Sequence, residues 1–158
     1  MDEKEVGKYK ITHLGVIDED KLYGLPSKWK EEYDIDLAET EYKDKGSLSV
    51  KWEGEKDHTK YIKSTYEIKL SIDGRTPVEL IEGDKKVKKT KAKVKIEITS
   101  KMITDKEKKL EETGFMKKFE KFYNKYIVKD SVGNHKKEIE KYTKQLYKDF
   151  KSALGIEE

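Results

Sequence analysis

The sequence predicts an α+β fold, in which one antiparallel meander sheet is covered on one face by amphipathic helices at the C-terminus. Two patterns predict it. Apolar and polar residues alternate through most of residues 35 to 102, as in strands with one buried face. After Thr104 the apolar residues recur at helical spacing instead. With 158 residues, we expect a single domain in which 1–104 form a strand, a short helix and the sheet, and 105–158 form two helices that pack on the sheet.

The first elements follow from short local patterns. Residues 8–17 are rich in β-branched and aromatic side chains and predict a strand. Asp18 is a suitable helix cap, and Pro26 suits the first turn of a helix. A short helix is therefore expected over residues 20–33, with a break at Gly24.

The meander is predicted from period-two segments separated by glycine-containing turns. Asp73-Gly74 is the clearest turn, because this dipeptide favours the positive backbone angles of a two-residue hairpin. Further turns are expected at residues 43–46 and 83–84. The predicted strands cover residues 35–42, 48–53, 62–72, 78–80 and 92–102.

Two helices are expected after the sheet, with a break over residues 128–134. An aromatic stripe from Phe115 to Tyr126 predicts the first helix, which would cover the sheet. The second helix would end at Gly155, a typical C-terminal cap. Its own apolar stripe would then need separate cover, from the neighbouring helix or from another subunit. The residues of this second stripe are Ile139, Tyr142, Leu146 and Phe150.

Composition limits the classes of function. Charged residues make up 44% of the chain, yet the net charge is only +3, which favours a folded and highly soluble protein. Arg75 is the one arginine among 36 basic residues, and there is no cysteine, so neither disulfides nor thiol chemistry are expected. The lysine bias fits heat adaptation or an AT-rich genome equally well. No signal peptide or membrane span is predicted, so we expect a cytoplasmic or virion-internal protein.

No motif of catalysis or cofactor binding is found. The three histidines His13, His58 and His135 are far apart in sequence, and no HxH, HExxH, GxSxG or phosphate-binding glycine motif occurs. The sequence therefore predicts no catalytic residue, no metal ligand and no cofactor. An enzyme is not expected.

The most concentrated charge is a run of lysines between Lys85 and Lys95. Three interpretations remain open: protection of a sheet edge from pairing, salt-dependent binding of nucleic acid, and contact with an acidic protein. Edge protection is favoured, because the stretch contains neither arginine nor an aromatic side chain for base stacking. The candidate contact residues are Lys85, Lys86, Lys88, Lys89 and Lys91.

Two resemblances accompany these patterns. The segments 41–72 and 123–130 resemble small, uncharacterised Lys/Glu-rich proteins of archaeal type, which implies a shared α+β fold and no particular activity. The order of strand, helix, meander and long C-terminal helix is similar to that of helix-grip folds. Those folds carry apolar ligands beneath the helix, which implies a small ligand carrier as an alternative function.

Together these observations predict a non-enzymatic structural or protein-interaction module. Its expected partner is itself or another protein, and self-assembly would use the C-terminal helices. The alternatives are the apolar-ligand carrier and a weak, non-specific nucleic-acid binder that uses the lysine run.

Overall fold

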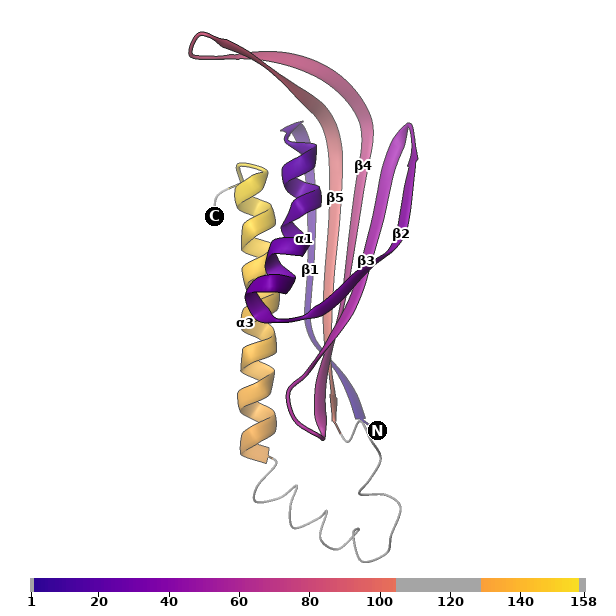
Figure 1. The fold of residues 1–158 in the computed structure, drawn as a ribbon, viewed down its shortest axis with the longest axis vertical. Coiled ribbons are helices and arrows are strands. Elements are labelled where there is room, and N and C mark those ends of the chain that lie inside the picture. Colours follow the sequence, from indigo (N-terminus) through magenta and orange to yellow (C-terminus); the bar gives the residue numbers. More distant parts are fainter. Residues whose placement is uncertain (1, 105–128, 157–158) are drawn as a thin grey trace, which may run out of the picture.

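The computed structural model describes residues 2–104 and 129–156. Five strands form one antiparallel sheet in the order β1-β5-β4-β3-β2, and two helices lie on one of its faces (Figure 1). The α+β class and the antiparallel meander are confirmed. The elements are β1 (Asp2–Ile17), α1 (Glu19–Tyr33), β2 (Asp36–Lys45), β3 (Ser47–Asp57), β4 (Ile62–Glu82), β5 (Lys85–Thr104) and α3 (Lys129–Ala153).

The helix α1 begins as the sequence predicts but does not break. Asp18 is its N-cap, and the carboxylate accepts a hydrogen bond of 3.2 Å from the backbone N–H of Lys21. The helix then continues through Gly24 and carries Pro26 in its interior instead of in its first turn. Pro26 is buried with Leu22 and Trp29, so apolar burial offsets the backbone hydrogen bond that a proline cannot donate.

The predicted turn at Asp73-Gly74 is wrong. Gly74 does adopt a positive φ of 62°, but the chain passes through an irregularity in the ladder between Asp73 and Thr76 and continues as the same strand. A glycine with positive φ serves a β-bulge as well as a turn, so the dipeptide alone does not separate the two. The real turn is at Gly83, where φ is 63°, as expected for residues 83–84. The predicted strands 62–72 and 78–80 are therefore one strand, β4.

The sheet has one dry face and one wet face, as the alternation predicts. Along β4 and β5 the buried side chains alternate with exposed or half-buried ones. The outer face carries lysines and glutamates in cross-strand ion pairs, such as Lys10 with Glu97 at 3.4 Å and Lys101 with Glu3 at 3.0 Å. These pairs are solvent-exposed and contribute little to stability, but they keep the uncovered face hydrophilic.

The helix α3 covers the dry face together with α1 (Figure 1). It begins at Lys129, so the predicted break over residues 128–134 is wrong from that residue onward. Its end is as predicted, since Gly155 has a φ of 72° and the N–H of Ile156 bonds the carbonyl of Lys151 at 2.9 Å. The other predicted C-terminal helix, with the stripe from Phe115 to Tyr126, lies outside the described residues.

An aromatic contact and buried hydrogen bonds hold the two helices against the sheet and against each other. The Trp29 ring meets Tyr66 edge to face, with ring centroids 5.0 Å apart. The Trp29 indole Nε1–H donates to the backbone carbonyl of Tyr142 in α3 at 2.8 Å. The buried hydroxyls of Thr143 and Ser100 bond each other at 2.9 Å, which fixes α3 against β5 without an unsatisfied polar group.

Candidate functional site

The predicted interaction stripe of α3 faces the chain's own core. Ile139, Leu146 and Phe150 are fully buried, and Tyr142 is 8% exposed. They pack with the dry face of the sheet and with α1 in a single apolar cluster. In the described part of the chain α3 is itself the sheet's cover, so this stripe needs no second subunit.

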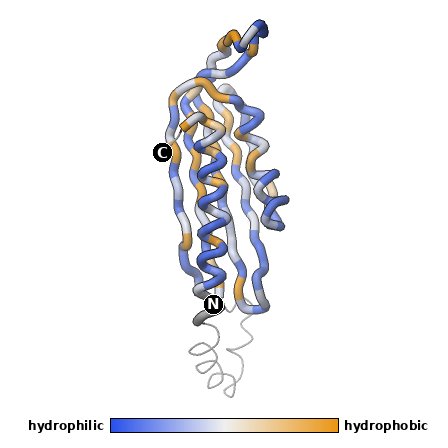
Figure 2. The backbone as a smooth tube through the Cα atoms, turned by 90° about the vertical axis from the view of Figure 1, so that its left-hand side faces the viewer, coloured by the Kyte–Doolittle hydropathy of each residue, from blue (hydrophilic) through white to orange (hydrophobic). Residues whose placement is uncertain are grey.

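The predicted lysines lie on a projecting hairpin. Residues 85–89 of β5 do not pair with β1, and the residues of β4 after Ile72 do not pair with β3. The two strands then continue together as a ribbon that leaves the body of the sheet (Figures 1 and 2). We call residues 74–91 the arm; Thr90 and Lys91 at its base still pair with β1. Figure 2 shows the tip of the arm beyond the end of the sheet.

The arm concentrates the charge of the protein. It contains six basic residues against three acidic ones, a net charge of +3, which equals the net charge of the whole chain. Lys89 is half-buried and pairs with Glu82 at 3.3 Å. The other four predicted lysines are exposed and make no ion pair within the described ranges. They are Lys85, Lys86, Lys88 and Lys91.

Arg75 fixes the base of the arm. Its guanidinium donates to Glu19 Oε1 at 3.0 Å, to the carbonyl of Gly46 at 3.1 Å and to the carboxylate of Asp44. These groups come from the start of α1 and from the hairpin between β2 and β3. A planar guanidinium can serve three acceptors at once, which an ammonium group does with less geometric control. Arg75 is therefore a structural residue and is not free for a ligand.

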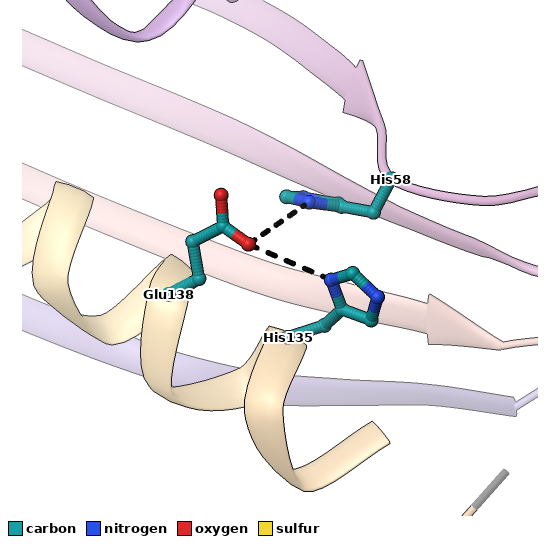
Figure 3. Close-up of side chains that lie close together, drawn as sticks. All are labelled: His58, His135 and Glu138. Atoms are coloured by element: carbon teal, nitrogen blue, oxygen red, sulfur yellow. Dashed lines mark ion pairs between the residues drawn. The ribbon is translucent and has the colours of Figure 1, made fainter. Parts of the chain in front are cut away.

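Two of the three separated histidines meet in space. His58 follows β3 and His135 lies in the first part of α3, and their ring centroids are 5.2 Å apart. Figure 3 shows Glu138 pointing toward both rings. Glu138 Oε2 lies 3.9 Å from His58 Nδ1 and 3.5 Å from His135 Nδ1. His13, on β1, is not part of this cluster.

Partners outside the cluster orient these side chains. His58 Nε2 bonds Ser64 Oγ at 2.8 Å, and Ser64 Oγ donates to the hydroxyl of Tyr66 at 2.7 Å. Glu138 Oε1 accepts a hydrogen bond from the hydroxyl of Tyr142. That bond lowers the pKa of Glu138, so the carboxylate is ionised at neutral pH. Burial lowers the pKa of His58 below its usual value and favours the neutral ring.

The sequence interpretation missed this cluster because 77 residues separate His58 from His135. One local signal was present: His135 and Glu138 are three residues apart, which places them on the same side of a helix. The histidines were tested only for HxH and HExxH spacing, so this signal was not used. The third member, His58, lies in the loop after β3, and the position of that loop depends on the whole sheet.

Tyr66 gives a pH prediction for the core beneath this cluster. Burial raises its pKa to about 12, against 10.0 for a free tyrosine. As the pH rises, the unfolded chain therefore loses this proton at a lower pH than the folded chain does. The contribution of Tyr66 to the free energy of unfolding is complete below pH 10 and is lost between pH 10 and 12. Between pH 9 and pH 11.5 wild type should lose roughly 2 kcal/mol more unfolding free energy than Tyr66→Phe in denaturant titrations. Equal losses of unfolding free energy in wild type and Tyr66→Phe would contradict this prediction.

One surface hollow of about 790 Å³ lies at the outer face of the sheet, away from the helices. Charged side chains dominate its lining, among them Glu3, Glu53, Glu67 and Lys101. A carrier of the helix-grip kind would hold an apolar ligand between sheet and helix, and this hollow is neither apolar nor in that place.

Among the described residues, no helix has the length and apolar character needed to cross a membrane. Comparison with protein-family models, curated proteins and solved structures finds no match to this chain. The resemblances to archaeal-type proteins and to helix-grip folds therefore stay predictions.

Proposed function

We propose that the protein is a non-enzymatic interaction module that binds nucleic acid, without sequence preference, through the arm. The observation that carries this proposal is the concentration of five lysines on the arm, four of which are exposed and make no ion pair within the described ranges. Lysine side chains that face phosphates release condensed counterions, which is the main source of non-specific affinity for nucleic acid.

The pairing of β4 with β5 in the arm is compatible with nucleic acid as the partner. Directly paired residues share a face of a ribbon, and Val78 pairs with Lys89 while Glu79 pairs with Lys88. The lysines therefore divide between the two faces of the ribbon. The major groove of DNA admits a two-stranded β-ribbon, and long lysine side chains on either face of such a ribbon can reach toward phosphates. One face carries Lys85, Lys89 and Lys91, and the other carries Lys86 and Lys88.

The predicted alternatives receive less support from the geometry. Self-assembly through Ile139, Tyr142, Leu146 and Phe150 would require these side chains to leave the core. Protection of a strand edge explains lysines along exposed edges, and lysines that do this can also bind nucleic acid. Edge protection alone, however, does not explain why the arm extends beyond the sheet.

Binding of a fluorescein-labelled 20-base-pair DNA duplex, measured by anisotropy, tests the proposal. We expect Lys85→Gln/Lys86→Gln/Lys88→Gln to weaken binding about 10-fold or more at low salt, because three phosphate contacts are removed. The matched control removes the same charge from the outer face of the sheet, as Lys10→Gln/Lys69→Gln/Lys95→Gln, and should change affinity little. An equal loss in both triple variants would contradict a role for the arm.

A further inference from the structure

We propose that His58, His135 and Glu138 form a binding site for one divalent transition-metal ion, with Zn²⁺ as the ion that fits the donor set best. This inference is independent of the nucleic-acid proposal. Within residues 2–104 and 129–156, one ligand atom from each of the three residues lies within 4.8 Å of the other two. Two imidazole nitrogens and a carboxylate oxygen are a common donor set for Zn²⁺.

The orientation of His58 leaves a lone pair aimed into the cluster. Because Ser64 Oγ donates its hydrogen to Tyr66, it is the acceptor for the Nε2–H of His58. The neutral ring then carries no proton on Nδ1, the nitrogen 3.9 Å from Glu138 Oε2. The His58 side chain is only 2% exposed, so water does not readily satisfy that nitrogen. A lone pair that faces a carboxylate oxygen is repelled by it, and a cation bound between the two atoms would turn this contact into an attraction.

His135 offers the second donor nitrogen of the cluster. Its Nδ1 is buried and has no hydrogen-bond partner among the described residues, although Glu138 Oε2 lies at an ion-pair distance of 3.5 Å. A buried polar atom without a partner is unusual in a native structure, and a bound metal ion would satisfy it. The Nδ1 atoms of both rings face the same carboxylate oxygen of Glu138 (Figure 3).

The surroundings resemble the support that metal ligands need. Ser64 fixes the ring of His58, and the Tyr142 hydroxyl holds Glu138 Oε1, which leaves Oε2 toward the two rings. Tetrahedral coordination at about 2.0–2.1 Å places ligand atoms roughly 3.3 Å apart, so atoms that now lie within 4.8 Å of one another need to close by at most about 1.5 Å. The Glu138 side chain is 39% exposed, so solvent can complete the coordination.

The donor types separate transition metals from hard cations. Mg²⁺ and Ca²⁺ prefer sets of oxygen ligands, and this cluster offers a single carboxylate with two nitrogens. A bound Zn²⁺ would join the loop after β3 to the first part of α3, two segments 77 residues apart in the sequence. The ion would thus hold α3 against the sheet.

Titration of the metal-stripped, untagged protein with Zn²⁺ in a calorimeter tests the site. Wild type should bind one ion per chain, and the thermal midpoint should rise in excess Zn²⁺. His135→Gln should weaken binding by about 100-fold or more. Tyr142→Phe removes only the hydroxyl that bonds Glu138 and should weaken binding by about 10-fold. His13→Gln removes a histidine elsewhere in the sheet and should bind as wild type does.

Circular dichroism of each variant before titration separates loss of the site from loss of the fold. His135 is 22% exposed in its side chain, so His135→Gln should remain folded. Two results would overturn the proposal. One is the absence of a Zn²⁺ isotherm in folded wild type, and the other is equal affinity in wild type and folded His135→Gln.

Discussion

Phe150→Ala is expected to lower the free energy of unfolding by about 3–5 kcal/mol. The ring is fully buried where α3 packs on the sheet, and truncation both removes its burial and leaves a cavity. Denaturant unfolding, followed by circular dichroism, measures the change. Lys148→Ala, an exposed position on the same helix, is the matched control and should differ from wild type by less than about 0.5 kcal/mol.

The same experiment distinguishes an internal core from an interface between copies. If α3 covers its own sheet, the loss caused by Phe150→Ala should not depend on protein concentration. A loss below about 1 kcal/mol, or one that grows with dilution, would mean that the stripe of α3 is completed by another chain.

Gly54→Ala should also destabilise the fold strongly, by about 2–4 kcal/mol, although it adds only one methyl group. Gly54 lies on β3 opposite Leu37 of β2. A Cβ atom there would be 2.5 Å from the carbonyl oxygen of Asp36 and 2.8 Å from the Cα of Leu37. Both contacts are with backbone, so a side-chain rotation cannot relieve them, and the edge strand β2 would have to move away.

Gly24→Ala is the control for this substitution. Nothing lies within 4 Å of the Cβ that alanine would add at Gly24, inside the helix α1. Alanine should therefore stabilise the helix by about 0.5–1 kcal/mol. Thermal melts of the two variants should move in opposite directions, and a Gly54→Ala protein as stable as wild type would show that β2 does not approach β3 this closely.

Much of the fold could be predicted from periodicity. The alternation from Ile62 to Ile72 identifies the buried face of β4 residue by residue, and Asp18 and Gly155 mark helix ends correctly. The prediction was wrong at Asp73-Gly74, because a positive φ suits a bulge and a turn alike. As a result, the length of β4 was underestimated, and with it the arm.

The His58 cluster could not be predicted from local patterns. Its members become neighbours only when α3 docks beside the loop after β3, and that docking depends on contacts such as Trp29 Nε1 with the Tyr142 carbonyl. Tyr142 was predicted as an interaction residue from its helical spacing alone. In the structure its ring is buried, and its hydroxyl bonds Glu138, so the same residue serves both the core and the cluster.

The salt dependence of DNA binding by the wild-type protein tests the central functional proposal most directly. If the five lysines of the arm meet phosphates, the logarithm of the binding constant should fall with the logarithm of salt concentration at a slope of about −4.5. Anisotropy of the labelled duplex across a salt series gives this slope. Absence of binding at low salt, or a slope near zero, would contradict the proposal that the arm binds nucleic acid.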